Sequence, residues 1–324
     1  MNYKIAIVGA TGIVGRETLK ILHERNIDRN EIVLYASAKS ANKAIKIGNR
    51  KYVVRELNDK IFNEKLDFAL FCTRENISEQ YVKKLAKTGT KVVDFSSIYR
   101  KKYPLIVPEV NREVIRGNII CNPNCSTSGA VVALNNIHKK FGLDRVVYST
   151  YQAVSGAGKG AIDDLHRKTG ELKKFAYPIA GNIIPYIGEI DKAGYSKEEN
   201  KMIYETRKIL GDKTIRITAT CVRVPVEISH GESINFKTKK KCTLEDIKKT
   251  LTQSEGVYVQ DEYPHFPMPI DVAGQNNVFV GRIRKDASEK NSFNMFIVSD
   301  NLRKGAAQNG VQILEELIKL KEKK

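Results

Sequence analysis

The sequence predicts an α/β protein with two domains: a first domain built on a parallel sheet covered by helices, and a second α+β domain with a mixed sheet. The chain has 324 residues, a length that suits two domains better than one. Short β-rich runs alternate with helix-like stretches up to residue 125, and longer alternating strands follow residue 127. The first pattern is typical of parallel sheets and the second of antiparallel or mixed sheets.

The elements of the first domain follow one another in short steps. An apolar strand at 3–8 leads into a helix at 12–26, with Val14, Ile21 and Leu22 on one face. Further β-rich runs lie at 31–37, 67–72, 91–97 and 118–122, with a helix-like stretch at 78–89. Parallel strands need long crossover connections, and the helical stretches supply them.

The second domain is predicted from longer runs with alternating polarity. They lie at 145–155, 214–226, 232–240 and 277–284. Near the end of the chain, residues 306–320 return to helical spacing, with Ala307, Val311, Leu314 and Ile318 on one face.

The composition predicts a cytoplasmic protein with free thiols. No apolar run approaches the roughly 20 residues that span a bilayer, and the N-terminus lacks the apolar core of a signal peptide. Five scattered cysteines do not suggest a disulfide framework. The net charge of +18 fits either an anionic partner or a solvated lysine-rich surface. The spread of the lysines, without interleaved aromatic residues, argues against nucleic acid.

A glycine-rich turn follows the first strand. In "VGATGIVGRE" the residues Gly9, Gly12 and Gly15 form G-x-x-G-x-x-G and open the first helix. This is a variant of the dinucleotide fingerprint, in which the backbone and the helix N-terminus receive a pyrophosphate. The motif predicts a Rossmann-type nucleotide-binding domain. The alternative is a tight turn that binds no ligand.

The end of the second strand favours NADP over NAD. An NAD site places an acid about 20 residues beyond the glycines, where it holds the ribose hydroxyls. This strand ends in "YASAKSANK", which has no acid. Ser37, Lys39 and Ser40 instead suit a 2′-phosphate, although Lys39 also fits an ordinary loop lysine.

Cys125 stands in "NPNCST", between a strand and an apolar run that begins near Ser128. A thiol near a helix N-terminus faces the positive end of the helix dipole, which favours the nucleophilic thiolate. The alternative is a buried structural cysteine. Cys121 and Cys125, with three residues between them and no nearby histidine, make a poor metal pattern, and no metal is predicted. The other cysteines lie in or beside apolar strands and are interpreted as packing residues.

A nucleophilic cysteine needs a base, and the chain has five histidines. His23 lies on the first helix, His138 precedes "KKFG" and is expected to be solvated, and His166 is expected on a surface helix. His230 ends the stretch "RITATCVRVPVEISH" beside a glycine, where a side chain can project into a cleft. Arg223 lies seven residues earlier, on the same or the opposite face of that strand. The residues alone leave the role of His230 open.

With these motifs in place, the chain resembles aspartate-β-semialdehyde dehydrogenase along essentially its whole length. The matching segments include "GATGIVG", "ASAKSANK", "DFSSIYR", "NPNCST", "YQAVSGAGKGA", "CVRVPVEISHGES" and "DNLRKGAAQNGVQI". "NPNCST" and the spacing between Arg223 and His230 make the match specific.

The resemblance implies a role for each matching residue. Cys125 would form a thioester, His230 would act as general acid/base, and Gln152 would orient the acyl intermediate. The substrate would be held by Arg223 at its α-carboxylate, Glu198 at its amine, and Lys201 and Arg100 at its phosphate, with Asn124 nearby. The contacts to NADP would come from Thr11, Gly12, Ile13, Val14, Lys39, Ser40, Ser155, Gly156 and Asn301.

The implied reaction is the NADPH-dependent reductive dephosphorylation of L-4-aspartyl phosphate to L-aspartate 4-semialdehyde. It belongs to the aspartate-family pathway that leads to lysine and diaminopimelate, threonine and methionine. The expected domains are 1–126 with 302–324 for NADP, and 127–301 for catalysis and dimerisation as a homodimer. No membrane or nucleic-acid partner is expected.

Two departures from the family pattern stand out. Lys39 stands where many relatives carry arginine, and "FCTRENISEQ", around Thr73, replaces a small Gly- and Ser-rich turn. Three rival readings are N-acetylglutamyl-phosphate reductase, a catalytically silent homologue and a nucleic-acid-binding protein. Retention of Cys125, Gln152, Arg223 and His230 together argues against the silent homologue.

Overall fold

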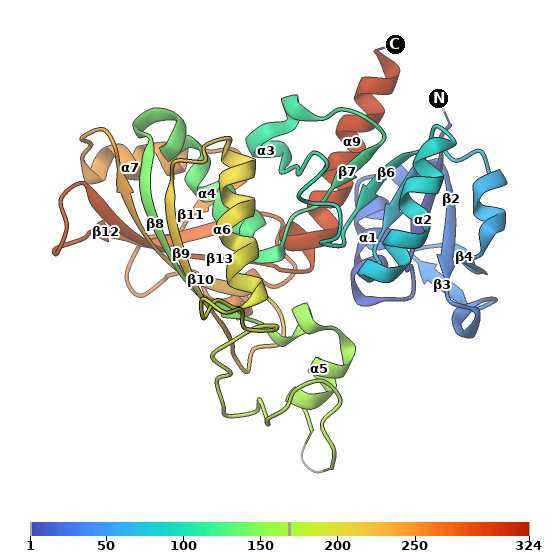
Figure 1. Cartoon of the computed structure of the whole chain (residues 1–324), viewed down its shortest axis with the longest axis horizontal. Coiled ribbons are helices and arrows are strands. Elements are labelled where there is room, and N and C mark those ends of the chain that lie inside the picture. The colour runs from blue at the N-terminus through green and yellow to red at the C-terminus, as the bar shows by residue number, and fades with distance from the viewer. Residues whose placement is uncertain (1, 168–169, 324) are drawn as a thin grey trace. The chain divides into compact units, whose positions relative to one another are not determined.

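The computed structural model describes residues 2–167 and 170–323, which fall into two compact units. Unit 1 comprises Met1–Pro123 and Ala306–Lys324, and unit 2 comprises Asn124–Gly305. These limits lie within four residues of the boundaries expected from the sequence, and they assign Asn124 and Cys125 to unit 2. Figure 1 shows the elements of both units.

Unit 1 is an α/β unit with strand order β3-β4-β2-β1-β5-β6-β7. All neighbouring strands are parallel except the hairpin β3–β4. Its strands are β1 (Lys4–Val8), β2 (Glu31–Ala36), β3 (Ala44–Ile47), β4 (Arg50–Glu56), β5 (Phe68–Phe71), β6 (Lys91–Asp94) and β7 (Ile119–Cys121). Its helices are α1 (Ile13–Glu24), α2 (Glu75–Lys87), α3 (Pro108–Asn111) and α9 (Gln308–Glu322).

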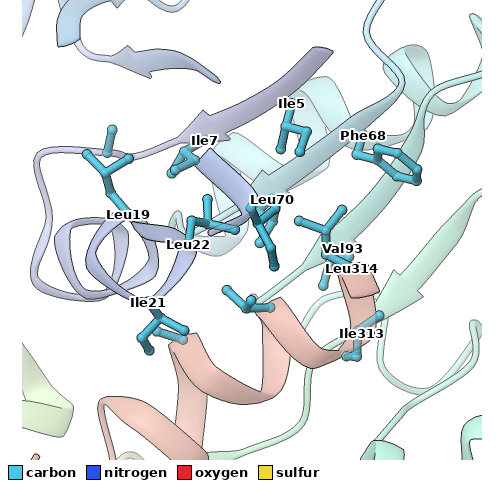
Figure 2. Close-up of a cluster of buried hydrophobic side chains, with 14 of the residues drawn as sticks. Ile5, Ile7, Leu19, Ile21, Leu22, Phe68, Leu70, Val93, Ile313 and Leu314 are labelled. Carbon is cyan, nitrogen blue, oxygen red and sulfur yellow. The ribbon is translucent and has the colours of Figure 1, made fainter. Parts of the chain in front are cut away.

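The core of unit 1 joins the two ends of the chain. Ile5 and Ile7 of β1 and Leu22 of α1 are fully buried in one cluster with Leu314 of α9 (Figure 2). Burying a side chain of this size contributes about 1.5–3 kcal/mol, so the C-terminal helix is an integral part of unit 1.

Unit 2 contains a mixed sheet with strand order β11-β12-β13-β10-β8-β9. The pairs β8–β9 and β11–β12 are parallel and the others antiparallel. Its strands are β8 (Leu143–Gln152), β9 (Arg216–Arg223), β10 (His230–Thr238), β11 (Val257–Val259), β12 (Val278–Lys285) and β13 (Ser292–Ser299). Its helices are α4 (Cys125–Phe141), α5 (Lys159–Leu165), α6 (Lys197–Leu210), α7 (Leu244–Thr252) and α8 (Pro269–Val272).

The structure corrects the expected relation between Arg223 and His230. Arg223 ends β9 and His230 begins β10, so the two residues lie on different strands with β8 between them. Pro225 lacks a backbone N–H, and Ser229 has φ of 77°, a left-handed conformation that interrupts an extended chain. These two residues explain why the run from 214 to 230 is not one strand.

Within residues 2–167 and 170–323, no helix combines the length and the apolar character needed to cross a membrane.

Candidate active site

Asn124 sets the position of Cys125 at the start of α4. Its side-chain Oδ1 accepts hydrogen bonds from the backbone N–H groups of Ser126 (3.0 Å) and Thr127 (3.2 Å), as an N-cap does. Cys125 is therefore the first residue of the helix. The junction "NPNCST" thus brings the thiol to the positive end of a 17-residue helix dipole.

The Cys125 thiol contacts the imidazole of His230. The Sγ–Nε2 distance is 3.2 Å, within the limit for a hydrogen bond to sulfur. The other ring nitrogen, Nδ1, accepts a hydrogen bond of 3.0 Å from the backbone N–H of Ala153. His230 is fully buried, and this burial, followed by the positive charge of Arg223, lowers the pKa of its ring to about 3. The ring is therefore neutral at physiological pH.

Three strand ends meet at this pair. Gln152 ends β8 and is in register with Arg223 at the end of β9, while His230 begins β10 on the other side of β8. The Arg223 Nη1 donates to the carbonyl of Ala153 at 2.7 Å. A Cβ on Gly156 would lie 3.3 Å from that Nη1 and 3.5 Å from His230 Nε2. Glycine at 156 therefore leaves room directly beside both side chains.

A buried carboxylate lies beside the N-cap. Glu198 of α6 accepts from Asn124 Nδ2 at 2.7 Å and from Lys201 Nζ at 3.3 Å. Burial opposes its ionisation, but Lys201, Asn124 and Arg223 together hold its pKa below the usual value. The site therefore presents a negative charge next to two cations, an arrangement suited to a zwitterionic amino-acid substrate.

Unit 2 holds other buried polar groups that were not predicted from the sequence. Glu205 accepts from the backbone N–H of Asn124 at 2.7 Å and fixes the approach to the helix. Glu232 is fully buried two residues after His230, and Ser229 is buried directly before it. Glu232, the acid in "HGES", occupies the same alternating positions of its strand as apolar residues, so its inward position could have been predicted from the sequence. The contact of Glu205 with Asn124 depends on tertiary structure and could not.

The glycine-rich turn of unit 1 has the form a dinucleotide requires. Gly9 has φ of 84°, and a Cβ there would collide with the carbonyl oxygen of Cys72, while a Cβ on Gly15 would collide with that of Gly9. Gly12 is the N-cap of α1 and has no side chain to compete for the first amide groups. Thr11, Ile13 and Val14 complete the turn and are half-buried.

The polar residues expected at the 2′-phosphate lie together after β2. Ser37 is the N-cap of the short helix Ala38–Ser40, which contains Lys39. Ser37 and Lys39 are exposed, and Ser40 is half-buried.

Three further predicted residues have structural partners. Arg100 is buried in unit 1, and its Nη2 donates to the carbonyl of Phe95 at 2.8 Å. In unit 2, Asn301 donates to Ser155 Oγ at 2.9 Å.

In two of the other cysteines, Cys72 and Cys221, burial disfavours the thiolate form. Cys72 is a packing residue whose burial raises its pKa to about 12, and burial also raises the pKa of Cys221. His138 was expected to be solvated but is half-buried. Its Nδ1 accepts a hydrogen bond of 3.1 Å from the backbone N–H of Leu143. The part of the chain that the structure describes holds no cluster of three or more His, Cys, Asp or Glu side chains suited to a metal ion.

Two family models match the chain. One is described as the semialdehyde dehydrogenase NAD binding domain and matches residues 4–118. The other is the semialdehyde dehydrogenase dimerisation domain and matches residues 134–304.

Individual relatives match over nearly the full length. The aspartate-semialdehyde dehydrogenase of Aquifex aeolicus is 47% identical over 98% of this chain and 99% of that protein. The Bacillus subtilis protein of the same name is 41% identical over 98% and 97%. Among solved structures, aspartate semialdehyde dehydrogenase II of Vibrio cholerae complexed with ASA has a TM-score of 0.95 at 38% identity, covering 98% and 99%. The Candida albicans enzyme with NADP has a TM-score of 0.78 at 27% identity, covering 98% and 99%.

Proposed function

Because this chain belongs to the aspartate-semialdehyde dehydrogenase family, we propose that it reduces L-4-aspartyl phosphate to L-aspartate 4-semialdehyde with release of phosphate, using NADPH. The Vibrio cholerae relative complexed with ASA supports this substrate. The observation that carries the proposal is the 3.2 Å contact between Cys125 Sγ and His230 Nε2 at the N-terminus of α4.

Cys125 acts as the nucleophile. Its sulfur attacks the acyl carbon of aspartyl phosphate, a C–S bond forms, and the C–O bond to phosphate breaks. The phosphate leaves with the bonding electrons, and the enzyme retains a thioester. When bound, NADPH would supply a hydride to the thioester carbon. The C–S bond then breaks, the bonding electrons return to the Cys125 sulfur, and the semialdehyde leaves.

The surrounding side chains hold the substrate and manage the proton. Arg223 binds the α-carboxylate with its forked guanidinium, and Glu198 faces the α-ammonium group. Gln152 orients the acyl carbonyl. In the oxidative direction, His230 removes the thiol proton before the sulfur attacks the semialdehyde.

Lys201 and Arg100 are assigned to the phosphate. A doubly charged phosphoryl group needs cationic donors, and these two residues match the family motif. The Lys201 ammonium lies 3.3 Å from the Glu198 carboxylate. The proposed phosphate site is therefore adjacent to the proposed site for the substrate amine.

NADP is the proposed cofactor. The tight turn at Gly9 and Gly15 suits the pyrophosphate, while Ser37, Lys39 and Ser40 suit the 2′-phosphate. The Candida albicans relative was solved with NADP, which supports the same choice. The protein is further proposed to act in the cytoplasm as a homodimer through unit 2, in the pathway to lysine, threonine and methionine.

A phosphate-dependent assay tests the proposal. The purified protein should sustain turnover of aspartate semialdehyde and NADP⁺ to NADPH, beyond the first equivalent per subunit, only when phosphate is present. N-acetylglutamate semialdehyde is the control substrate, because it lacks the free amine that Glu198 is proposed to face. Equal turnover of the two aldehydes, or turnover that does not depend on phosphate, would contradict the proposal.

A further inference from the structure

Ser229, the residue directly before His230, is held in a conformation that a serine rarely adopts. Its φ is 77°, in the left-handed region that glycine enters without cost and other residues avoid. The residue is fully buried, so the surrounding protein packs against it on all sides. Such a conformation persists only where surrounding contacts determine it.

The contact that determines it comes from Asn301. The backbone N–H of Ser229 donates to Asn301 Oδ1 at 2.8 Å. Asn301 is itself 2% exposed and follows Asp300, whose carboxylate accepts from the backbone N–H groups of Leu302 and Arg303. The carboxamide therefore extends from a turn with its own anchors.

Asn301 also holds the segment on the other side of His230. Its Nδ2 donates to Ser155 Oγ at 2.9 Å. Ser155 is followed by Gly156, which lies against the imidazole, and preceded two residues earlier by Ala153, whose N–H donates to His230 Nδ1. One carboxamide thus links the backbone that precedes His230 to the turn that holds its ring.

We propose that Asn301 is a positioning residue for the acid/base reaction, which holds His230 against Cys125 by stabilising the left-handed Ser229 and the Ser155 turn. This inference rests on the proposed function, because it takes His230 as the acid/base. It differs from the cofactor contact that the family resemblance implies for Asn301, and the two roles predict different kinetics.

Asn301→Ala removes the hydrogen bonds of the carboxamide to Ser229 and to Ser155. Ser229 then loses the acceptor that holds it at positive φ, the chain before His230 relaxes, and the ring moves from the sulfur. Misplacement of a catalytic group by about 1 Å costs on the order of 10²-fold, so kcat should fall by about 10- to 100-fold. The KM for NADP should change by less than about threefold, since the loss lies in the chemical step and not in cofactor binding.

Ser229→Gly provides the decisive second change. Glycine adopts positive φ without the restraint, so Ser229→Gly introduced into Asn301→Ala should restore the part of the lost kcat that is due to Ser229. A role of Asn301 that is only structural, or only in cofactor binding, predicts no such rescue. Asn111→Ala is the matched control, because Asn111 is also buried and bonds two backbone groups, at Leu105 and Val107 in unit 1. It should lower stability without changing kcat.

The experiment measures kcat and the KM for NADP in the oxidative direction for the wild type, the single variants and the double variant. A raised KM for NADP with kcat intact in Asn301→Ala, or a double variant no faster than Asn301→Ala, would overturn the inference. If Asn301→Ala does not fold, the double variant tests the inference. Its activity would mean that glycine at position 229 replaces the restraint that Asn301 normally provides. His230→Asn in the same assay distinguishes failure of the proposed function from failure of this inference. Full activity of that variant would refute the acid/base role of His230, and with it any role of Asn301 in positioning His230 for catalysis.

Discussion

Replacing Glu232 with glutamine should stabilise the protein increasingly as the pH rises. Glu232 is fully buried on β10, and neither carboxylate oxygen has a hydrogen-bond partner among the described residues. Burial, followed by the negative charge of Glu198, raises its pKa well above the usual value. Folding at neutral pH therefore requires this acid to take up a proton, whereas glutamine has the same shape and needs none.

The magnitude follows from proton linkage. A group whose pKa is raised in the folded state contributes stability that is complete below its unfolded pKa and is lost as pH rises toward its folded pKa. For Glu232 the loss begins near pH 4.3, the ordinary value for glutamate, and amounts to about 1.4 kcal/mol for each pH unit. The free energy of unfolding of Glu232→Gln should therefore exceed that of the wild type by a margin that grows at up to this slope from about pH 5 and levels off once the pH passes the raised pKa of folded Glu232.

Urea unfolding at pH 5, 6, 7 and 8, followed by circular dichroism, measures this margin. Glu198→Gln is the matched control of opposite sign. The pKa of Glu198 is held low, so its ionised form stabilises the fold by an amount that is complete above the usual carboxylate range. The glutamine variant should therefore be less stable than the wild type by a nearly constant margin from pH 5 to 8. A constant difference between Glu232→Gln and the wild type at all four pH values would refute the reasoning, because it would mean that Glu232 does not change its protonation on folding.

Three further predictions concern the cofactor and the phosphate. Lys39→Glu should lower kcat/KM for NADPH more than for NADH, because the new carboxylate repels a 2′-phosphate; equal use of both cofactors by the wild type would contradict the assignment. Lys201→Met should raise the KM for phosphate much more than that for semialdehyde, since a hydrogen bond to a charged group is worth about 1.5–3 kcal/mol. An unchanged KM for phosphate would leave Lys201 as a partner of Glu198 alone. Gly9→Ala should abolish NADP binding measured by calorimetry, because its Cβ would collide with the carbonyl of Cys72; binding at wild-type affinity would show that the turn does not hold the cofactor.

The fold could be predicted largely from local pattern. The strands β1, β2, β5, β6 and β7 are short, largely apolar runs, and the glycine turn between β1 and α1 lies where the sequence places it. The hairpin β3–β4 was not predicted, because its residues are mostly exposed and of mixed polarity. The assignment of Arg223 and His230 to one strand was wrong. Pro225 marks part of the break locally, but the left-handed Ser229 is held by Asn301, which lies 72 residues further along the chain. No local pattern carries that information.

Part of the candidate site could likewise be predicted from local sequence, and part depends on tertiary contacts. The "NPNCST" junction predicts a thiol at a helix N-terminus, and the N-cap geometry of Asn124 confirms that placement of Cys125. Sequence alone left the base among five histidines open, because the contact with His230 spans 105 residues and forms only when β10 and α4 pack together. Glu205 was overlooked for the same reason, since an acid on a helix is normally solvent-exposed.

The most direct test of the central claim is the covalent intermediate on Cys125. Protein mixed with aspartate semialdehyde and NADP⁺ in the absence of phosphate should oxidise one equivalent of aldehyde for each subunit, release one equivalent of NADPH and then stop. Peptide mass spectrometry should find the aspartyl group attached to Cys125, and added phosphate should remove it. An adduct on another cysteine, or the same burst of NADPH from Cys125→Ala, would contradict the claim that Cys125 forms the thioester.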